Sequence, residues 1–254
     1  MNSARGTAAG NLERVRERIE QAARRSGRRA VEITLIAVSK THPAEKIREL
    51  FDAGVRHFGE NRVQEWESKH AHLLDLAATW HMIGHLQSNK AARAVRLFSC
   101  VDSVDSAALA ERLDRAKKEL DLAGEDENKN LRPPGRDADP RLGILIECKL
   151  DPGATKTGVS GDEVPQLAEA VLSLPHLQLR GFMGVPPYFD QAEQARPYFR
   201  RLRELRDSLQ ARLGRELFPV LSMGMSHDFE VAIEEGATEI RVGTALFGER
   251  FRNA

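Results

Sequence analysis

The sequence is poor in features that would direct it to a membrane or to an oxidising compartment. It has no uninterrupted apolar stretch close to the roughly 18 residues that a membrane-spanning helix needs. Its two cysteines, Cys100 and Cys148, lie in apolar runs, and no leader with a long apolar core precedes the first amphipathic stretch. These absences predict a soluble protein of the reducing cytoplasm, with both thiols as small core residues.

The chain also has no excess of either charge. Its 38 lysines and arginines balance its 38 aspartates and glutamates, so the formal net charge is zero. No overall field would draw such a protein to nucleic acid or to an anionic membrane, and neither is a predicted partner. Any site for an anion must therefore be built locally.

What the sequence does contain is a regular alternation of short apolar runs and helical patterns. After an amphipathic helix that starts at Asn11, runs that predict strands occur at 33–40, 55–59, 79–84, 97–102, 142–148, 177–185, 218–223 and 239–243. Short apolar strands separated by helices are typical of a parallel sheet. The length of 254 residues suits one (β/α)8 barrel. We therefore predict an α/β fold, a single TIM barrel over 1–254 with an extra amino-terminal helix. An open doubly wound sheet is the alternative.

Helices are predicted between these strands at 44–53, 61–76, 87–95, 106–122, 162–174, 191–213 and 226–235. Residues 124–140 break the alternation, because Glu, Asp, Asn, Pro and Gly dominate them without periodic apolar residues. We predict an inserted surface loop there.

Lys40 ends the first apolar run. Alternation along a strand puts it on the same face as Thr34, Ile36 and Val38. Burying an unpaired ammonium is costly, so such a lysine tends to lose its proton and become a nucleophile. A strand-end lysine that reaches into solvent is the alternative. The next helix would begin at Pro43, with Thr41 or His42 as its cap.

The loops after the last two predicted strands suit a phosphate. Gly224 permits close backbone approach, and Ser226 would open a helix whose N–H groups attract an anion. Alternation points Arg241 into the barrel. TIM barrels commonly bind phosphate between these two loops. The alternatives are glycines that only make turns, a serine that only caps a helix, and an arginine paired with Glu239 or Glu147.

An amine and a phosphate site at one end of a barrel call for a ligand that carries an aldehyde and a phosphate. Pyridoxal 5′-phosphate (PLP) is the first candidate, held by Lys40 as a Schiff base. A sugar phosphate handled by a Schiff-base aldolase is the second.

No metal site is predicted. His81 and His85 are four residues apart, but in an extended chain this spacing spans roughly 13 Å, too far to share one ion. The other histidines considered have no ligand spacing and are interpreted as core or surface residues: His57, His70, His72 and His227.

Five ordered motifs carry a resemblance to a known family. They are AVSKT at 37–41, FGEN at 58–61, WHMIGHLQSNK at 80–90, SMGMSHD at 222–228 and RVGTALFG at 241–248. From about Leu12 to Phe251 the sequence resembles the pyridoxal phosphate homeostasis proteins, also called the YggS or PROSC family. The resemblance implies a barrel like the amino-terminal domain of alanine racemase.

The resemblance also implies roles for particular residues. Lys40 binds PLP covalently, Asn61 lies beside the ring, and Arg241 faces the pyridine nitrogen. The phosphate site contains Ser226, Gly243 and Thr244. Gly224 and Met225, in the loop of Ser226, are predicted to be cofactor-binding residues as well. An arginine at the pyridine nitrogen disfavours its protonation, which weakens PLP as an electron sink.

The function implied is a PLP-binding protein of intracellular PLP homeostasis that holds PLP reversibly, without catalytic residues and with little or no turnover. We expect a monomer, with apo PLP-dependent enzymes as recipients. The alternative is a PLP-dependent amino-acid racemase. Racemisation needs a second acid/base opposite Lys40. In alanine racemase that group comes from a carboxy-terminal domain of the partner subunit, a domain that we do not find here. Of the two tyrosines, Tyr188 and Tyr198, the first could approach the site, but a structural role is favoured for it.

Overall fold

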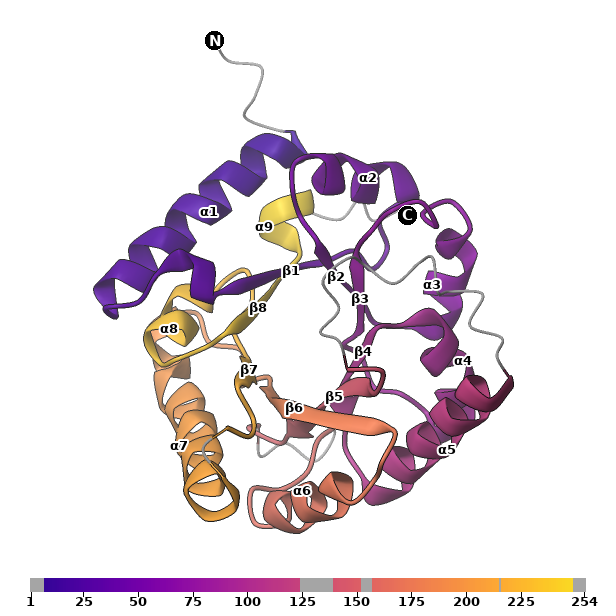
Figure 1. The fold of residues 1–254 in the computed structure, drawn as a ribbon. Helices are drawn as coiled ribbons and strands as arrows, with labels where there is room; N and C mark the ends of the chain where they lie inside the picture. Colours follow the sequence, from indigo (N-terminus) through magenta and orange to yellow (C-terminus); the bar gives the residue numbers. More distant parts are fainter. Residues whose placement is uncertain (1–6, 124–138, 152–156, 215, 249–254) are drawn as a thin grey trace.

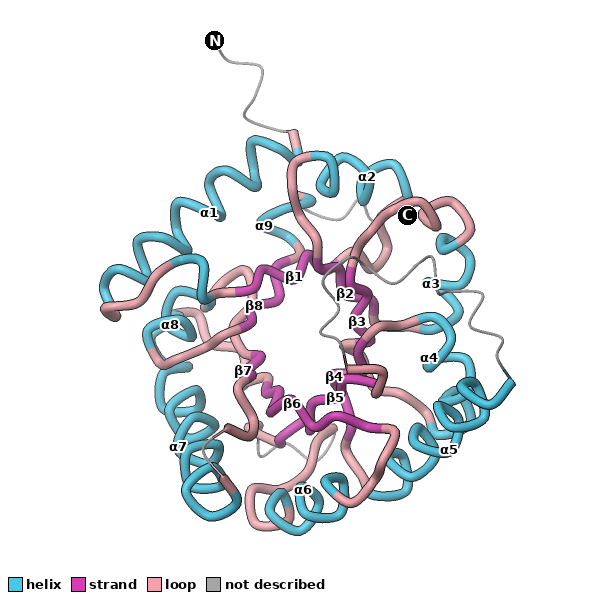
Figure 2. Tube along the Cα trace, viewed as in Figure 1, coloured by secondary structure: helices cyan, strands magenta, loops and turns pink. Residues whose placement is uncertain are grey.

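The fold is a closed parallel barrel. The computed structural model describes residues 7–123, 139–151, 157–214 and 216–248. Eight strands pair in sequence order, and the last pairs with the first. Figures 1 and 2 look through the ring of strands, with the helices around its outside. The predicted TIM barrel is confirmed, and the open-sheet alternative is wrong.

The strands are short and mostly buried, as expected where helices cover a parallel sheet. They are β1 (Thr34–Val38), β2 (His57–Glu60), β3 (Thr79–Met82), β4 (Cys100–Val104), β5 (Leu142–Cys148), β6 (Leu177–Gly184), β7 (Val220–Ser222) and β8 (Glu239–Val242). In the register of β1 with β8, Ile36 lies opposite Arg241 and Ala37 opposite Val242. The carboxyl ends of the first and last strands are therefore neighbours.

The extra helix α1 (Ala8–Arg25) precedes the barrel, as predicted, and packs against α2, α8 and α9 (Figure 1). The other helices are α2 (Ala44–Asp52), α3 (Val63–His70), α4 (Ala91–Leu97), α5 (Ala107–Ala123), α6 (Val164–Leu172), α7 (Arg196–Leu213), α8 (Phe229–Glu234) and α9 (Thr244–Phe247). Short 3-10 helices are η1 (Ala30–Glu32), η2 (Ser88–Lys90) and η4 (Ala192–Ala195). None of the helices in these described segments is long and apolar enough to cross a membrane.

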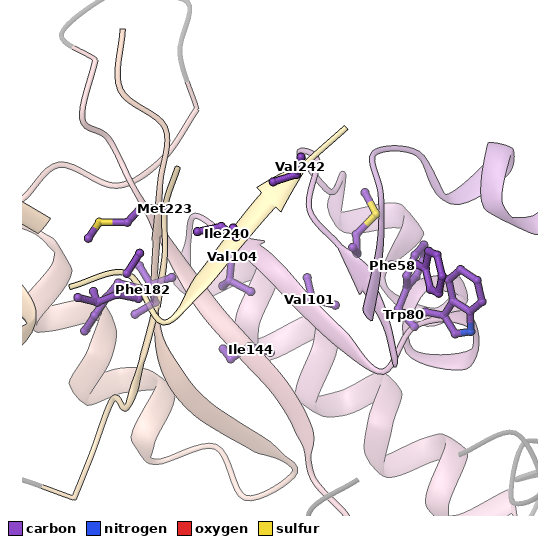
Figure 3. Packing of buried hydrophobic residues seen from close by; sticks show 14 of the residues in the cluster. Phe58, Trp80, Val101, Val104, Ile144, Phe182, Met223, Ile240 and Val242 are labelled. Atoms are coloured by element: carbon purple, nitrogen blue, oxygen red, sulfur yellow. The ribbon is translucent and has the colours of Figure 1, made fainter. Parts of the chain in front are cut away.

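The main apolar core lies between the strands and the surrounding helices. Figure 3 shows part of it, including Phe58 and Trp80, whose ring centroids are 5.1 Å apart. Trp66 of α3 packs on Trp80 at 3.9 Å. A second, small apolar cluster consists of Leu145, Met183 and Val220. The large outer core fixes the strand ends, and hence the loops that follow them.

Several predicted boundaries are wrong for local reasons. The sequence predicts a helix as far as residue 76, but α3 ends at His70 and tight turns bury Leu73 and Leu76 instead. The N-cap of α2 is Pro43, so neither Thr41 nor His42 caps this helix. The predicted insertion at 124–140 lies outside the described residues, except for 139 and 140.

Candidate functional site

Lys40 lies at the barrel mouth, the end where the carboxyl ends of the strands meet. β1 ends at Val38, so Lys40 lies two residues beyond it, in a turn, and is half-buried. The next residue, Thr41, has a φ of 66°, which is uncommon for a β-branched side chain. We call residues 39–42 the Lys40 turn. The expectation of an uncharged amine stays a prediction.

The loops after β7 and β8 are joined by the hydroxyl group of Ser226. Its Oγ accepts the backbone N–H groups of Gly243 at 3.3 Å and Ala245 at 3.2 Å. The prediction that Ser226 opens a helix is wrong, because α8 begins at Phe229 and Ser226 lies in the turn before it. Ser226 therefore connects two loops instead of capping one helix, and Thr244 begins α9 directly beside it.

Gly224 shapes the loop after β7. Its φ is +92°, and a Cβ atom on it would lie 2.6 Å from Cβ of Ala232 and 2.9 Å from Cα of Phe229. The close backbone approach predicted for Gly224 is thus an approach to α8. The following N–H group, that of Met225, donates to Oδ1 of Asp228 at 2.6 Å. Packing against α8 therefore fixes the course of this loop.

Arg241 is buried, with 4% of its surface exposed. Its Nη1 donates to Oγ of Ser222 at 2.8 Å and its Nη2 donates to the carbonyl oxygen of Gly184 at 3.0 Å. Burial lowers the pKa of Arg241, and nearby carboxylates, Asp102 foremost, partly offset this. In the part of the chain that the structure describes, the hydrogen bonds of Arg241 go to these neutral groups. The alternative, in which Arg241 pairs with Glu239 or Glu147, is therefore not what these hydrogen bonds show.

Asn61 follows β2 and is half-buried. A Cβ on Gly84 would lie only 2.4 Å from the carbonyl oxygen of Asn61, so a glycine is needed where the loop after β3 passes it. Ser103 of β4 holds that loop by donating to the Gly84 carbonyl at 2.6 Å. Asn61 lines a cavity of about 270 Å³ together with Arg62 and Lys90. Three neighbouring strand ends thus fix the position of Asn61.

The pairing of β1 with β8 brings the loop that follows the first strand next to the loop that follows the last strand. A Cβ on Gly243 would lie 3.5 Å from Cβ of Val38, the last residue of β1. The ring of His42 stacks on Phe247 of α9, with centroids 4.3 Å apart. The Lys40 turn therefore lies beside the loop of Gly243 and the helix that follows it.

A chain of polar side chains on neighbouring strands, buried at His81 and Asp102 and half-buried at His57, was not predicted from the sequence. Nδ1 of His57 lies 3.1 Å from Nε2 of His81, and Nδ1 of His81 lies 2.8 Å from a carboxylate oxygen of Asp102. Burial, with His81 beside it, lowers the pKa of His57 to about 4. Burial opposes charge on His81 too, but Asp102 holds the pKa of His81 above its ordinary value. Of the two imidazole rings, that of His81 therefore binds an additional proton more readily than that of His57.

Cys100 adds a third potential metal ligand to His81 and Asp102. Within the described segments these residues form a group whose ligand atoms all lie within 4.8 Å of one another. Nη1 of Arg180 donates to Sγ of Cys100 at 3.6 Å. A guanidinium at this distance repels a cation, so the arrangement favours a charge-balanced polar cluster over a metal site.

The comparisons with known proteins first define a class. The family described as alanine racemase, N-terminal domain, matches residues 10–251. The solved alanine racemase of Clostridium difficile has a TM-score of 0.64 at 14% identity, over 96% of this chain and 56% of that chain. That likeness shows the fold alone. The class is a barrel of the alanine racemase amino-terminal type.

Nearer relatives define the family within this class. The pyridoxal phosphate homeostasis protein of Aquifex aeolicus is 43% identical over 94% of this chain and 96% of the relative. That of Escherichia coli is 40% identical over 95% and 96%. The PLP-bound structure of PipY from Synechococcus elongatus has a TM-score of 0.77 at 38% identity, over 95% of this chain and all of that chain. The chain belongs to the pyridoxal phosphate homeostasis protein family, which confirms the resemblance carried by the motifs.

Proposed function

We propose that this protein binds PLP, serves intracellular PLP homeostasis, and holds PLP reversibly as a Schiff base on Lys40 with little or no turnover. The observation that carries the proposal is the register of β1 with β8, which puts the Lys40 turn beside Gly243 and Thr244. An amine and an anion site at one mouth are what a phosphorylated aldehyde requires. The names of the relatives and the PLP-bound PipY structure support the same ligand.

In the proposed covalent step, Nζ of Lys40 adds to the aldehyde carbon. A C=N bond replaces the C=O bond, and the aldehyde oxygen leaves as water with the two hydrogens of the amine. No oxidant or further reactant is needed, and addition of water reverses the step. This reversibility suits a protein that stores and releases its ligand.

The residues of the β7 and β8 loops fit a phosphate. The Ser226 hydroxyl accepts two N–H groups, and its own O–H group is a donor suited to a phosphate oxygen. Gly224, Met225, Gly243 and Thr244 form the backbone around it. We propose that these residues hold the phosphate group of PLP and that Asn61 lies beside the ring.

The proposed lack of turnover follows from Arg241. Arg241 is buried, and in the proposed arrangement its guanidinium would face the pyridine nitrogen of PLP. It would then disfavour a proton there, because two like charges would lie side by side. Bound PLP supplies an electron sink for amino-acid chemistry, and an unprotonated ring makes that sink weak. Arg241 thus favours storage of PLP over its use.

One observation keeps an amino-acid racemase as the second candidate. Tyr188 lines a cavity of about 130 Å³ together with Met225 and Asp228, so a phenol lies near the proposed phosphate loop. It is 78% exposed and its ring lies 5.6 Å from that of His227. Incubation with a single amino-acid enantiomer in deuterated water separates the candidates. Steady exchange at Cα with loss of optical purity would favour the racemase.

We further propose a monomer that works in the cytoplasm and passes PLP to apo PLP-dependent enzymes. The support for the compartment is that Cys100 and Cys148 are both buried thiols, as is usual in a reducing environment.

The proposed attachment is tested by reducing a mixture of the protein and PLP with borohydride and mapping the adduct by mass spectrometry. We expect a pyridoxyl adduct on Lys40 in the wild type and none in Lys40→Ala. Lys46→Ala is the matched control, because Lys46 is an exposed lysine on the helix after the Lys40 turn. An adduct chiefly on another lysine, or no imine absorbance on adding PLP, would contradict the proposal.

A further inference from the structure

Lys69 of α3 contacts the Lys40 turn on both sides of Lys40. Its Nζ lies 3.2 Å from the carbonyl oxygen of Ser39 and 3.3 Å from that of His42. The same Nζ lies 2.8 Å from Oε1 of Glu60 and 3.0 Å from Oε1 of Glu65. The Lys69 side chain is only 12% exposed. One ammonium group thus joins the Lys40 turn to β2 and α3.

Glu65 lies one helical turn before Lys69 and holds Thr41, which stands between Ser39 and His42 in the Lys40 turn. Its Oε1 accepts the backbone N–H group of Thr41. Thr41 has the left-handed φ of 66°, a strained conformation for a β-branched residue that persists only where its surroundings enforce it. Glu65 and Lys69 together therefore hold the Lys40 turn in a shape that it would not keep alone.

Glu60 explains why Lys69 occupies this place. Glu60 is completely buried, and its Oε1 accepts the hydroxyl of Ser39 at 2.7 Å as well as the ammonium of Lys69. Its Oε2 has no hydrogen-bond partner among the residues that the structure describes. A buried carboxylate in this position needs a cation beside it. The core itself thus fixes the ammonium of Lys69 next to the Lys40 turn.

The opposite side of the Lys40 turn faces the proposed phosphate site. His42 stacks on Phe247 with an interplanar angle of 12°. Phe247 ends α9, the short helix that begins at Thr244. The Lys40 turn is therefore fixed between α3 on one side and α9 on the other.

We propose that Lys69 is a positioning residue for Lys40. It acts through the carbonyl groups of Ser39 and His42, without touching the ligand, and keeps the Lys40 amine where the aldehyde of bound PLP will be. This inference rests on the proposed function. Because the phosphate residues belong to the other side of the mouth, loss of Lys69 should slow the covalent step and leave non-covalent binding almost unchanged.

The test separates these two steps in a variant that keeps the core charge-balanced. Lys69→Met alone would leave the Glu60 carboxylate buried without its cation, so the double variant Glu60→Gln, Lys69→Met is used. The rate of imine formation at saturating PLP is followed by absorbance. The affinity for pyridoxine 5′-phosphate, which has no aldehyde, is measured by calorimetry. We expect imine formation to slow about tenfold or more, as for other small displacements of a reacting group. The affinity for the analogue should stay within about twofold.

Two further measurements sharpen the result. Lys46→Met removes another lysine that pairs with a glutamate on the same side of the barrel, and it should change neither quantity. Hydrogen exchange of the ligand-free double variant should be faster in residues 39–42 than in the wild type. An unchanged imine rate, or an equal loss of rate and of analogue affinity, would overturn the positioning role. If the wild type forms no imine with PLP, the proposed function itself fails and this inference falls with it.

Discussion

The two halves of the barrel mouth are held by different forces. In the half that carries Lys40, ionised side chains hold the turn, with Lys69 between Glu60 and Glu65. In the half formed by the β7 and β8 loops, the Ser226 hydroxyl binds backbone N–H groups and Gly224 packs against α8. The first half depends chiefly on protonation states, whereas the second depends chiefly on shape, with the contact of the Met225 N–H group to the Asp228 carboxylate as a charged exception.

This difference assigns different sensitivities to the two steps of the proposed function. Tight packing at a glycine with positive φ does not titrate, so the packing of the anion-binding half against α8 should depend little on pH. The Asp228 carboxylate, which accepts the Met225 N–H group and whose pKa burial raises, is the titratable contact that this half does have. The hydrogen bonds of a lysine with two carboxylates do depend on pH. Holding the phosphate and capturing the aldehyde should therefore respond to different mutations and to different conditions.

The largest expected effect is that of Gly224→Ala in the half that depends on shape. A Cβ there would lie 2.6 Å from Cβ of Ala232, and the φ of +92° is unfavourable for alanine. Strain and overpacking together should lower the free energy of unfolding by about 2–4 kcal/mol, measured by urea denaturation. Gly27→Ala is the control, because Gly27 has a φ of +70° with no atom within 4 Å of the added Cβ. It should cost about 1 kcal/mol. Equal losses would show that packing against α8 is unimportant.

A smaller effect is expected for Ser226→Ala, which tests the link between the two loops. The variant removes the acceptor for the N–H groups of Gly243 and Ala245, worth about 1–2 kcal/mol. PLP affinity should fall roughly tenfold. The borohydride adduct should still form on Lys40, because the other half of the mouth is untouched. Ser173→Ala, at an exposed serine, serves as control. Unchanged PLP affinity in Ser226→Ala would exclude this serine from the site.

The parts of the fold that sequence periodicity could predict are those whose burial is uniform or regular. Both ends of β5 agree with the prediction, because every residue from Leu142 to Cys148 is buried and the apolar run is continuous. The end of α3 differs from the predicted end at residue 76, because turns bury Leu73 and Leu76 as effectively as a helix would. A pattern of burial does not by itself distinguish the two.

The residues proposed for the site could be chosen from the sequence only where a motif or a strand pattern marks them. The strand pattern marks Arg241, which lies in β8, and the motifs mark Lys40, although it lies in the turn after β1 and not in the predicted strand. Lys69 carries no such signal, since a lysine four residues after a glutamate on a helix is typical of a solvated face. The chain from His57 through His81 to Asp102 was missed for a related reason. Its members meet because of the register between neighbouring strands, and one strand's pattern does not determine its register with the next.

The smallest effect, and the sharpest test of the comparison, is the pH dependence of the charged half. Burial raises the pKa of Glu60, and Lys69 only partly offsets it. Burial also opposes charge on Glu65, but the Thr41 amide and Lys69 hold the pKa of Glu65 below its usual range. The two carboxylates should therefore affect stability with opposite signs.

As pH rises through the ordinary glutamate range of about 4 to 5, Glu60 loses its proton in the unfolded chain first, so this residue lowers wild-type stability. The stability of Glu60→Gln relative to wild type should thus increase with pH. Glu65 contributes stability that is present above this range and is lost as pH falls through its lower folded pKa. The relative stability of Glu65→Gln should therefore decrease with rising pH. Urea denaturation at a series of pH values measures both variants. Slopes of the same sign would show that charge does not hold the Lys40 turn in the way its contacts indicate.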